Sequence, residues 1–399
     1  MISKKNMFGL LSVITALLLS MFITPAVAGA PGVFPDKIVI GSPADLQGPA
    51  AFVTNANFEG ARVLFQKVYD DKVYPRKIEV IQEHGGYSPA TVMKAGKLLI
   101  ERDNVFIFFV TTGTSATLAL NTILEKEKIP LVGMGCQAEV AAVPPKRYLF
   151  QHYTTYVDQA GIAVDYIIEK NGKDAKIAFF YQDDEFGYDG LRGFRARMKA
   201  YGIKPAAEAS FKRGAIDVSS QAMKMKAAKP GWVIVHSLWG ACGKLIKEAK
   251  KIGWKPQFMG ISGTADAVIL KLAGDAATYG KPFMGVVLNH PWDSDAWGAK
   301  EYRAAMKKYN PKAKLGTFSF WGYGMAKIVV EGLRRIKGEP TREKFIKALE
   351  SFRGFDTGCF PPLTWKSNFR KGSKGGMIVV QKEGTFKPIT GWKDVKVLK

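Results

Sequence analysis

In the first half of the chain, short apolar and β-branched runs alternate with stretches of helical periodicity. The stretch 57–69, for example, carries Phe58, Ala61, Leu64 and Phe65 on one face, as an amphipathic helix does. We expect strands at 37–41, 77–82, 105–110 and 129–132, and helices at 57–69, 89–101 and 115–127. Repeated β-α-β order of this kind predicts a parallel sheet with helices on both faces.

The same alternation starts again in the second half. We expect helices at 159–171, 190–201, 219–228 and 243–252, with strands at 176–181, 232–235 and 257–260. In the last third of the chain we expect helices at 295–309, 322–337 and 342–352, and then an extended tail that contains a strand at 376–381. Two successive doubly wound units predict an α/β protein with two lobes of similar build. The 399 residues are long enough to give each lobe its own core.

The first 28 residues have the pattern of a secretory signal peptide. Lys4 and Lys5 precede an apolar run at 7–23, and Ala26-Val27-Ala28 forms a small-x-small cleavage site. The run is short for a bilayer span, and no later stretch approaches 18 consecutive apolar residues. No Cys follows it, so a lipoprotein anchor is not expected. We therefore expect residues 1–28 to be removed and the mature protein to be periplasmic.

Composition and charge narrow the class of protein further. Hydrophobic residues make up 47% and charged residues 23%, which excludes a disordered, collagen-like or disulfide-dense chain. Lys and Arg number 58 against 35 Asp and Glu, a formal charge of +23 that attracts anionic surfaces and solutes. The basic residues are spread over amphipathic helices without a nucleic-acid-binding motif, so no nucleic-acid partner is expected.

Enzyme and metal motifs are mostly absent. Cys136, Cys242 and Cys359 lack the spacing of a zinc site, and the sequence leaves open whether two of them form a disulfide. There is no G-x-S-x-G, H-E-x-x-H or phosphate-binding loop. The acidic cluster 183–185 suits a metal site or, more commonly, a helix cap. We predict no catalytic residue, metal or cofactor; a secreted hydrolase that uses Asp183, Asp184 and a distant His is the enzymatic alternative.

Two loops at the ends of predicted strands are candidate binding sites, because ligands of open parallel sheets bind there. The first, Thr111 to Ser115, leads into a helix whose free N–H groups and dipole suit a carboxylate or phosphate. An ordinary N-cap explains its Thr and Ser residues equally well. The second, 133–138, reads G-x-G-x-x-A, but Pro144-Pro145 shortens the following helix, so a dinucleotide is not expected.

Several segments fall in one recognisable order. A strand at 37–41 and the loop Leu46-Gln47-Gly48-Pro49-Ala50-Ala51 come first, followed by segments 58–62, 114–115, 128–130, 183–187 and 355–358. In this order they resemble the leucine/isoleucine/valine-binding type of solute-binding proteins of ABC importers, over nearly all of the mature chain. The resemblance implies a type I periplasmic binding protein, with two parallel-sheet lobes joined by three crossovers. Lobe one would comprise 35–153 and 290–360, and lobe two 154–289 and 361–399.

The resemblance also implies a ligand site between the lobes. The loops at Gly113 and at Gly135 would hold a ligand carboxylate, and aromatic residues would form apolar walls that stabilise the complex by burial. The implied ligand-binding residues are Phe52, Gly113, Thr114, Ser115, Cys136, Gln137, Phe186, Trp239 (or Leu238) and Ser262.

One departure from the family concerns the ligand. Amino-acid binders of the family place an acid at the position of Ser262, to pair with the ligand ammonium, so Asp266 or Asp183 would have to replace it. A buried ammonium without a counter-charge costs several kcal/mol. The sequence therefore favours a carboxylate with an apolar or aromatic body.

These observations predict a periplasmic solute-binding protein that captures an amino acid or a related small organic carboxylate and presents it to a membrane permease. Closure of the lobes over the ligand would assemble the site, with one ligand per chain. We expect a monomer that performs no chemistry and needs no cofactor. The alternative is a ligand-sensing subunit that reports to a receptor or regulator through the same cleft.

Overall fold

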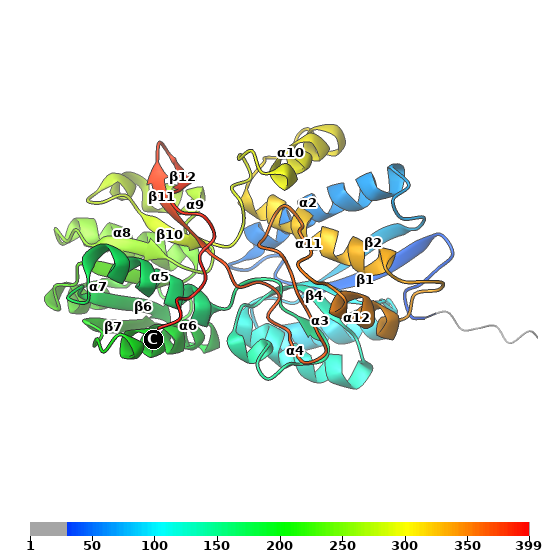
Figure 1. Cartoon of the computed structure of the whole chain (residues 1–399), viewed down its shortest axis with the longest axis horizontal. Coiled ribbons are helices and arrows are strands. Elements are labelled where there is room, and N and C mark those ends of the chain that lie inside the picture. Colours follow the sequence, from blue (N-terminus) through cyan, green and yellow to red (C-terminus); the bar gives the residue numbers. More distant parts are fainter. Residues whose placement is uncertain (1–29, 399) are drawn as a thin grey trace, which may run out of the picture.

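The computed structural model describes residues 30–398, so the predicted signal peptide lies outside the described residues. Two lobes lie side by side, each built around one sheet (Figure 1). The strands of both central sheets are nearly continuous apolar runs, as expected where helices cover both faces. The α/β class and the two-lobe architecture predicted from the sequence are confirmed.

The first sheet has the strand order β2-β1-β3-β4-β5, and all its pairings are parallel. Helices from both ends of the chain cover it, including α10, α11 and α12 from the last third (Figure 1). Its elements are β1 (Lys37–Ala44), α2 (Ala51–Asp70), β2 (Lys77–His84), α3 (Pro89–Glu101), β3 (Phe108–Thr112), α4 (Thr114–Glu127), β4 (Leu131–Gly135) and β5 (Leu149–Phe150), with α10 (Trp297–Tyr309), α11 (Thr317–Arg334) and α12 (Arg342–Glu350).

The second sheet has the order β12-β11-β10-β9-β8-β6-β7. Strands β6 to β10 are parallel, and the two strands of the tail add to the edge in antiparallel fashion. Its elements are α5 (Tyr156–Asn171), β6 (Ile177–Gln182), α6 (Glu185–Ala200), β7 (Ala207–Phe211), α7 (Ser219–Ala227), β8 (Trp232–His236), α8 (Trp239–Lys251), β9 (Gln257–Gly260), α9 (Ala267–Ala273), β10 (Met284–Val287), β11 (Met377–Lys382) and β12 (Thr385–Pro388).

The chain passes between the lobes three times: between β5 and α5, between β10 and α10, and between α12 and β11. The segment that follows α12 stays close to the first lobe before it crosses. Leu363 pairs with Phe355, and the Trp365 ring lies 5.4 Å from that of Phe150. The residue boundaries predicted for the two lobes stay a prediction.

Two glycines bring helices α2 and α11 into backbone contact. A methyl group at Gly60 would overlap the carbonyl oxygen of Ser319, and one at Gly322 would overlap that of Asn57. Because only glycine permits this approach, α11 lies directly against α2. This contact brings Asn57 of α2 close to Trp321 of α11.

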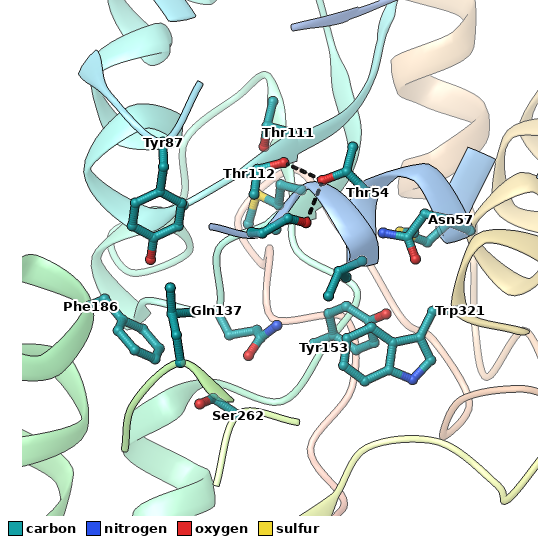
Figure 2. A pocket seen from close by; sticks show the side chains of 18 of the residues that line it. Thr54, Asn57, Tyr87, Thr111, Thr112, Gln137, Tyr153, Phe186, Ser262 and Trp321 are labelled. Carbon is teal, nitrogen blue, oxygen red and sulfur yellow. Dashed lines mark hydrogen bonds between the residues drawn. The ribbon is translucent and has the colours of Figure 1, made fainter. Parts of the chain in front are cut away.

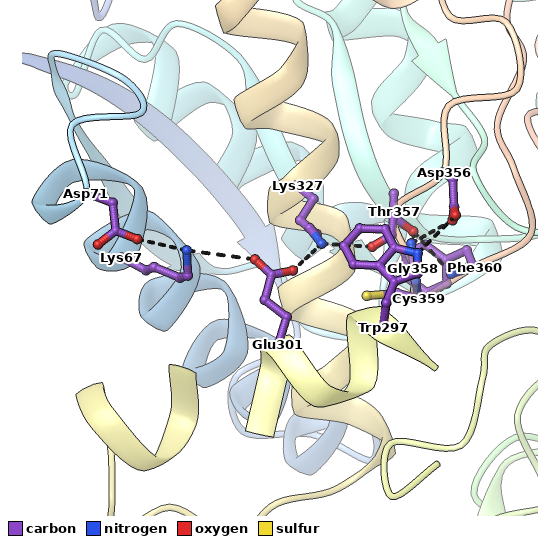
Figure 3. Close-up of polar contacts among 10 residues, drawn as sticks. All are labelled: Lys67, Asp71, Trp297, Glu301, Lys327, Asp356, Thr357, Gly358, Cys359 and Phe360. Carbon is purple, nitrogen blue, oxygen red and sulfur yellow. Dashed lines mark hydrogen bonds and ion pairs between the residues drawn. The ribbon is translucent and has the colours of Figure 1, made fainter. Parts of the chain in front are cut away.

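A charged cluster fixes α10 to the same lobe (Figure 3). The Lys327 ammonium on α11 bonds to Glu301 on α10 and, at 2.9 Å, to the carbonyl oxygen of Thr357. It also lies 3.9 Å from the centre of the Trp297 ring, in a cation–π arrangement. Lys67 of α2 lies 3.9 Å from the second Glu301 oxygen. The cluster therefore ties α2, α10, α11 and the third crossover together.

Sequence reasoning missed several elements. Strands β5, β7, β10 and β12 and helix α9 were not expected, and each is short or lies at an edge or near the tail. The strand expected at 105–110 is shifted, because the ladder begins only at Phe108. Between residues 30 and 398, no helix is both long and apolar enough to cross a membrane.

Candidate functional site

A cavity of about 640 Å³, counted out to its mouth, lies between the lobes where strand ends of both sheets meet (Figure 2). Loops, α2 and α11 of the first lobe form one side, and loops and helix N-termini of the second lobe form the other. The lining comprises Ala50, Val53, Thr54, Asn57, Tyr87, Thr111, Thr112, Gly113, Gly133, Met134, Gly135, Gln137, Tyr153, Tyr156, Phe186, Leu238, Trp239, Ser262, Trp321 and Met325.

One end of the cavity lies at the N-terminus of α4. Gly113 precedes this helix with φ 88°, a conformation that glycine adopts without strain. A side chain at Gly113 would meet the ring of Tyr87, so the backbone and this ring lie in close contact. The first N–H groups of a helix have no acceptor within it, and its dipole favours negative charge there. This end can therefore hold a carboxylate.

Threonine hydroxyls line the wall beside it. The Thr112 Oγ1 atom lies 3.0 Å from that of Thr54 on α2 and accepts from the Asp45 N–H at 3.1 Å. The Thr111 and Thr117 hydroxyls lie 2.8 Å apart. These bonds fix the rotamers of the threonines and join β3 to α2.

The wall from the second lobe centres on Phe186 and a neutral histidine. His236 is fully buried behind the Phe186 ring, with ring centres 4.0 Å apart. Its Nε2–H donates to the Phe186 carbonyl oxygen at 2.7 Å, and its Nδ1 lies 3.2 Å from the Ser262 hydroxyl. Burial lowers the pKa of His236 to about 4. The imidazole is therefore uncharged at neutral pH.

A chain of amides crosses the floor between the lobes. Gln159, which is fully buried, donates from Nε2 to the Thr154 carbonyl oxygen and accepts from the Ser262 N–H at 2.7 Å. Its Nε2 also lies 3.5 Å from the Gln137 Oε1. This arrangement couples the loop after β4 to the loop after β9.

The two lobes also touch at the mouth of the cavity. Arg213 donates to the Tyr87 carbonyl oxygen at 2.6 Å, stacks 4.7 Å from the Tyr87 ring and pairs with Asp184 at 2.8 Å. The Phe52 ring packs edge-on against Trp239, at 5.0 Å between ring centres. The structure is thus a closed form in which the second lobe covers the cavity.

Five of the nine residues expected in the site line the cavity: Gly113, Gln137, Phe186, Trp239 and Ser262. The other four do not. Phe52 lies at the mouth with 42% of its surface exposed, and the Ser115 hydroxyl donates to Glu185 of the second lobe at 2.7 Å. Thr114 and Cys136 are buried behind the lining, where burial raises the pKa of the Cys136 thiol to about 12. All three cysteines are buried and free.

The acids considered as ammonium partners lie elsewhere. Asp266 caps α9 by accepting from the Val268 N–H, and Asp183 accepts from the Tyr188 hydroxyl at 2.5 Å. Asp184 caps α6, which confirms the helix-cap interpretation of that cluster. Its oxygens are engaged by Arg213, Gln182 and two backbone N–H groups, so it offers a hydrolase no free base. Within residues 30–398 no cluster of three metal-ligating side chains occurs.

The lining residues of α2 and α11 and the three tyrosines of the wall were not expected from the sequence. Asn57 and Thr54 lie on the face of α2 that also carries Ala50 and Val53, and Trp321 comes from α11. Tyr87, Tyr153 and Tyr156 complete the wall. The i, i+3, i+4 spacing of 50, 53, 54 and 57 was visible in the sequence. Its mixed polarity, however, is equally typical of a solvated face.

The comparisons with known proteins agree with this architecture. Residues 37–385 match the model of a family described as periplasmic binding protein. The Leu/Ile/Val-binding protein homolog 7 of Brucella suis biovar 1 is 22% identical over 336 residues, covering 80% of this chain and 82% of its own. The Leu/Ile/Val-binding protein of Escherichia coli K12 is 21% identical over 345 residues, covering 85% of this chain and 90% of its own.

Solved structures share the fold. A possible leucine/isoleucine/valine-binding protein from Rhodopirellula baltica superimposes with a TM-score of 0.80 at 25% identity, covering 91% of this chain and 98% of its own. A fatty acid ABC transporter substrate-binding protein from Thermomonospora curvata also superimposes with a TM-score of 0.80. It is 21% identical and covers 92% of this chain and 94% of its own. Because the family model spans most of the sequence, the chain belongs to the periplasmic binding protein family.

Proposed function

We propose that the chain is the solute-binding component of an ABC importer. It captures a small organic ligand, an amino acid or a related carboxylate, in the interlobe cavity and presents it to a membrane permease. The cavity at the N-terminus of α4, closed by the second lobe, is the observation that carries the proposal. Residues 1–28 would direct the protein to the periplasm, where such components act, and the protein itself would perform no chemistry.

The names of the relatives support both ligand classes. The Escherichia coli relative is a Leu/Ile/Val-binding protein, and the Thermomonospora curvata neighbour serves fatty acids, which are carboxylates without an ammonium group. The low identity leaves the choice to the residues of this cavity. Membership of the family supports the capture of a ligand and its delivery to a permease. The identity of the ligand depends on the residues that line the cavity.

A thermal-shift panel on the protein from residue 29 onward tests the proposal. The panel holds leucine, valine, other amino acids, short amides, aliphatic acids and aromatic carboxylates. A ligand at 1,000 times its dissociation constant should stabilise the fold by about 4 kcal/mol, which raises the melting temperature measurably. Calorimetry should then give one site per chain. No shift with any compound, or two equivalent sites per chain, would contradict the proposal.

A further inference from the structure

The cavity has two chemically different ends (Figure 2). The end at α4 offers backbone N–H groups beside Tyr87 and Gly113. At the other end lie Asn57, Tyr153 and Trp321, with the Tyr153 and Trp321 ring centres 5.2 Å apart. A ligand held at the α4 end by a carboxylate therefore extends its body toward Asn57 and Tyr153.

No group in the cavity can balance a ligand ammonium. Among the described lining residues there is no Asp, Glu, Lys, Arg or His side chain. Among the acids close in sequence to lining residues, Glu185 accepts from the Ser115 hydroxyl, Asp184 caps α6 and Asp266 caps α9. The imidazoles of His236, beside Phe186, and His152, beside Tyr153, have pKa values that burial lowers to about 4 and about 3, so both are neutral. An ammonium would lose its hydration on entry without gaining a counter-charge.

Two buried polar atoms at the far end have no partner within the described part of the chain. These are the Oδ1 of Asn57, which is 7% exposed, and the hydroxyl of Tyr153, which is 2% exposed. Buried polar groups are nearly always hydrogen-bonded, and both residues line the cavity, so this unpaired pair is a candidate partner for a ligand group. A hydroxyl both donates and accepts, and it can therefore satisfy the amide and the phenol together.

We infer that the ligand is an aromatic carboxylate without an ammonium group, carrying a hydroxyl at the end remote from its carboxylate. This inference rests on the proposed function and names its ligand class. Backbone N–H groups of α4 bind the carboxylate, and Tyr87, Phe186 and Trp239 pack against the body of the ligand. Asn57 and Tyr153 bind the hydroxyl. Burial raises the pKa of Tyr153, so its phenol stays protonated and can donate.

Four matched compounds separate the two features. 3-Phenylpropanoate and 3-(4-hydroxyphenyl)propanoate differ only in the hydroxyl, and phenylalanine and tyrosine add the ammonium to each. Calorimetry on the mature protein should show the hydroxylated acid binding at least tenfold tighter than 3-phenylpropanoate, since an unpaired buried group weakens binding by roughly this factor. Each amino acid should bind at least a hundredfold weaker than its matched acid.

A variant assigns the hydroxyl to its partner. Asn57→Leu should reduce the preference for the hydroxylated acid, measured as the ratio of the two dissociation constants in the same variant, to threefold or less. Asn121→Leu, which removes a half-buried amide on α4 outside the cavity whose oxygen also lacks a partner within the described residues, is the control and should retain the full preference. A preference that survives in Asn57→Leu overturns the assignment.

The remaining outcomes distinguish the inference from the proposed function. Phenylalanine, leucine or glycine betaine binding tighter than the hydroxylated acid overturns the inference but leaves a solute-binding protein. Betaine is included because an aromatic wall can also hold a quaternary ammonium through cation–π contacts. Failure of every carboxylate, with or without an amine, overturns the proposed function itself.

Discussion

At the scale of single residues, Gln137 tests where the ligand carboxylate lies. It lines the cavity and is 6% exposed. Gln137→Glu would place a negative charge in the cavity that holds the ligand carboxylate, and we expect the repulsion between like charges to weaken binding at least tenfold. Calorimetry with the tightest carboxylate of the panel should show this loss at pH 8 and a smaller loss at pH 5.5, where the new acid is more protonated. Gln66→Glu, an equal charge change on the exposed face of α2, should have no effect.

Two buried histidines make stability depend on pH. Burial lowers the pKa of His152 to about 3 and that of His236 to about 4. Because both folded pKa values lie below the unfolded value of about 6.5, the unfolded state binds more protons as the pH falls. Stability is therefore full above about pH 6.5 and declines toward pH 4, with each histidine lowering it by about 2 kcal/mol between pH 8 and pH 5.

His152→Phe should remove part of that decline. Both ring nitrogens of His152 lack partners within residues 30–398, and its ring stacks 3.8 Å from Tyr153, so an apolar ring suits the site. Urea unfolding at pH 8 and pH 5 should show a pH difference about 2 kcal/mol smaller than in the unsubstituted protein. An unchanged difference would mean that His152 is not neutral in the folded protein.

Without the family resemblance, the candidate site could be predicted only at loops that follow predicted strands; Phe186 and Trp239, in the first turns of α6 and α8, were implied by the resemblance. Gly113 and Gln137 follow predicted strands, and the rule that ligands bind at strand ends identifies them without coordinates. Thr114 and Cys136 share these loops but face the core, because side-chain direction within a loop depends on backbone torsions that no periodicity encodes. Asn57 required knowledge of helix packing, since a polar residue on α2 looks solvated until α11 covers it.

At the scale of elements, the contact between α2 and α11 should be sensitive to a single methyl group. Gly322→Ala would force the Asn57 backbone away from α11, destabilising the fold by about 2 kcal/mol or more. It should also weaken ligand binding, because Asn57 and Trp321 both line the cavity. Gly240→Ala on α8 meets nothing within 4 Å and should be neutral or stabilising by about 0.5–1 kcal/mol. Urea unfolding and calorimetry of both variants measure the two effects.

The charged cluster on α10 offers a comparison between a covered and an exposed ion pair. Lys327, 14% exposed, holds Glu301 and the Trp297 ring, whereas Lys300, 59% exposed, pairs with exposed Asp295. Lys327→Met should destabilise by about 1–3 kcal/mol, and Lys300→Met by less than about 0.5 kcal/mol. Denaturant unfolding of the two variants measures the loss of folding free energy caused by each. Equal effects would show that the cluster does not fix α10.

Helices with strong periodicity and clear ends were predictable as elements. The helix at Pro89–Glu101 was predicted with its observed ends, because Pro starts it and apolar residues recur on one face. The start of α2 was missed by six residues, since its first turns mix alanine and polar residues that face the cavity. Strand β5 has only two residues and gives no alternation to detect.

At the scale of the whole molecule, the two-lobe plan followed from the repeated β-α order, while the assembly of the lobes did not. The helices α10 to α12 pack on the first lobe, although the whole second lobe up to β10 precedes them in the chain. No local sequence pattern predicts which lobe they join. Only the resemblance to a family implied it. Contacts such as the edge-on packing of Trp365 against Phe150 arise between segments more than 200 positions apart.

The closed arrangement predicts that Arg213 controls how long a ligand stays bound. It is a second-lobe side chain that bonds to the Tyr87 carbonyl oxygen, stacks on the Tyr87 ring and is held by Asp184. Arg213→Ala removes a hydrogen bond and a cation–π contact from the closed form only, worth about 1 kcal/mol together, so dissociation should be about fivefold faster. Stopped-flow displacement measures this rate, and Lys212→Ala, the exposed neighbour, is the control. Unfolding in urea should be unaffected, because the contact joins lobes rather than supporting either core. A slower association with unchanged dissociation would instead place Arg213 in ligand entry.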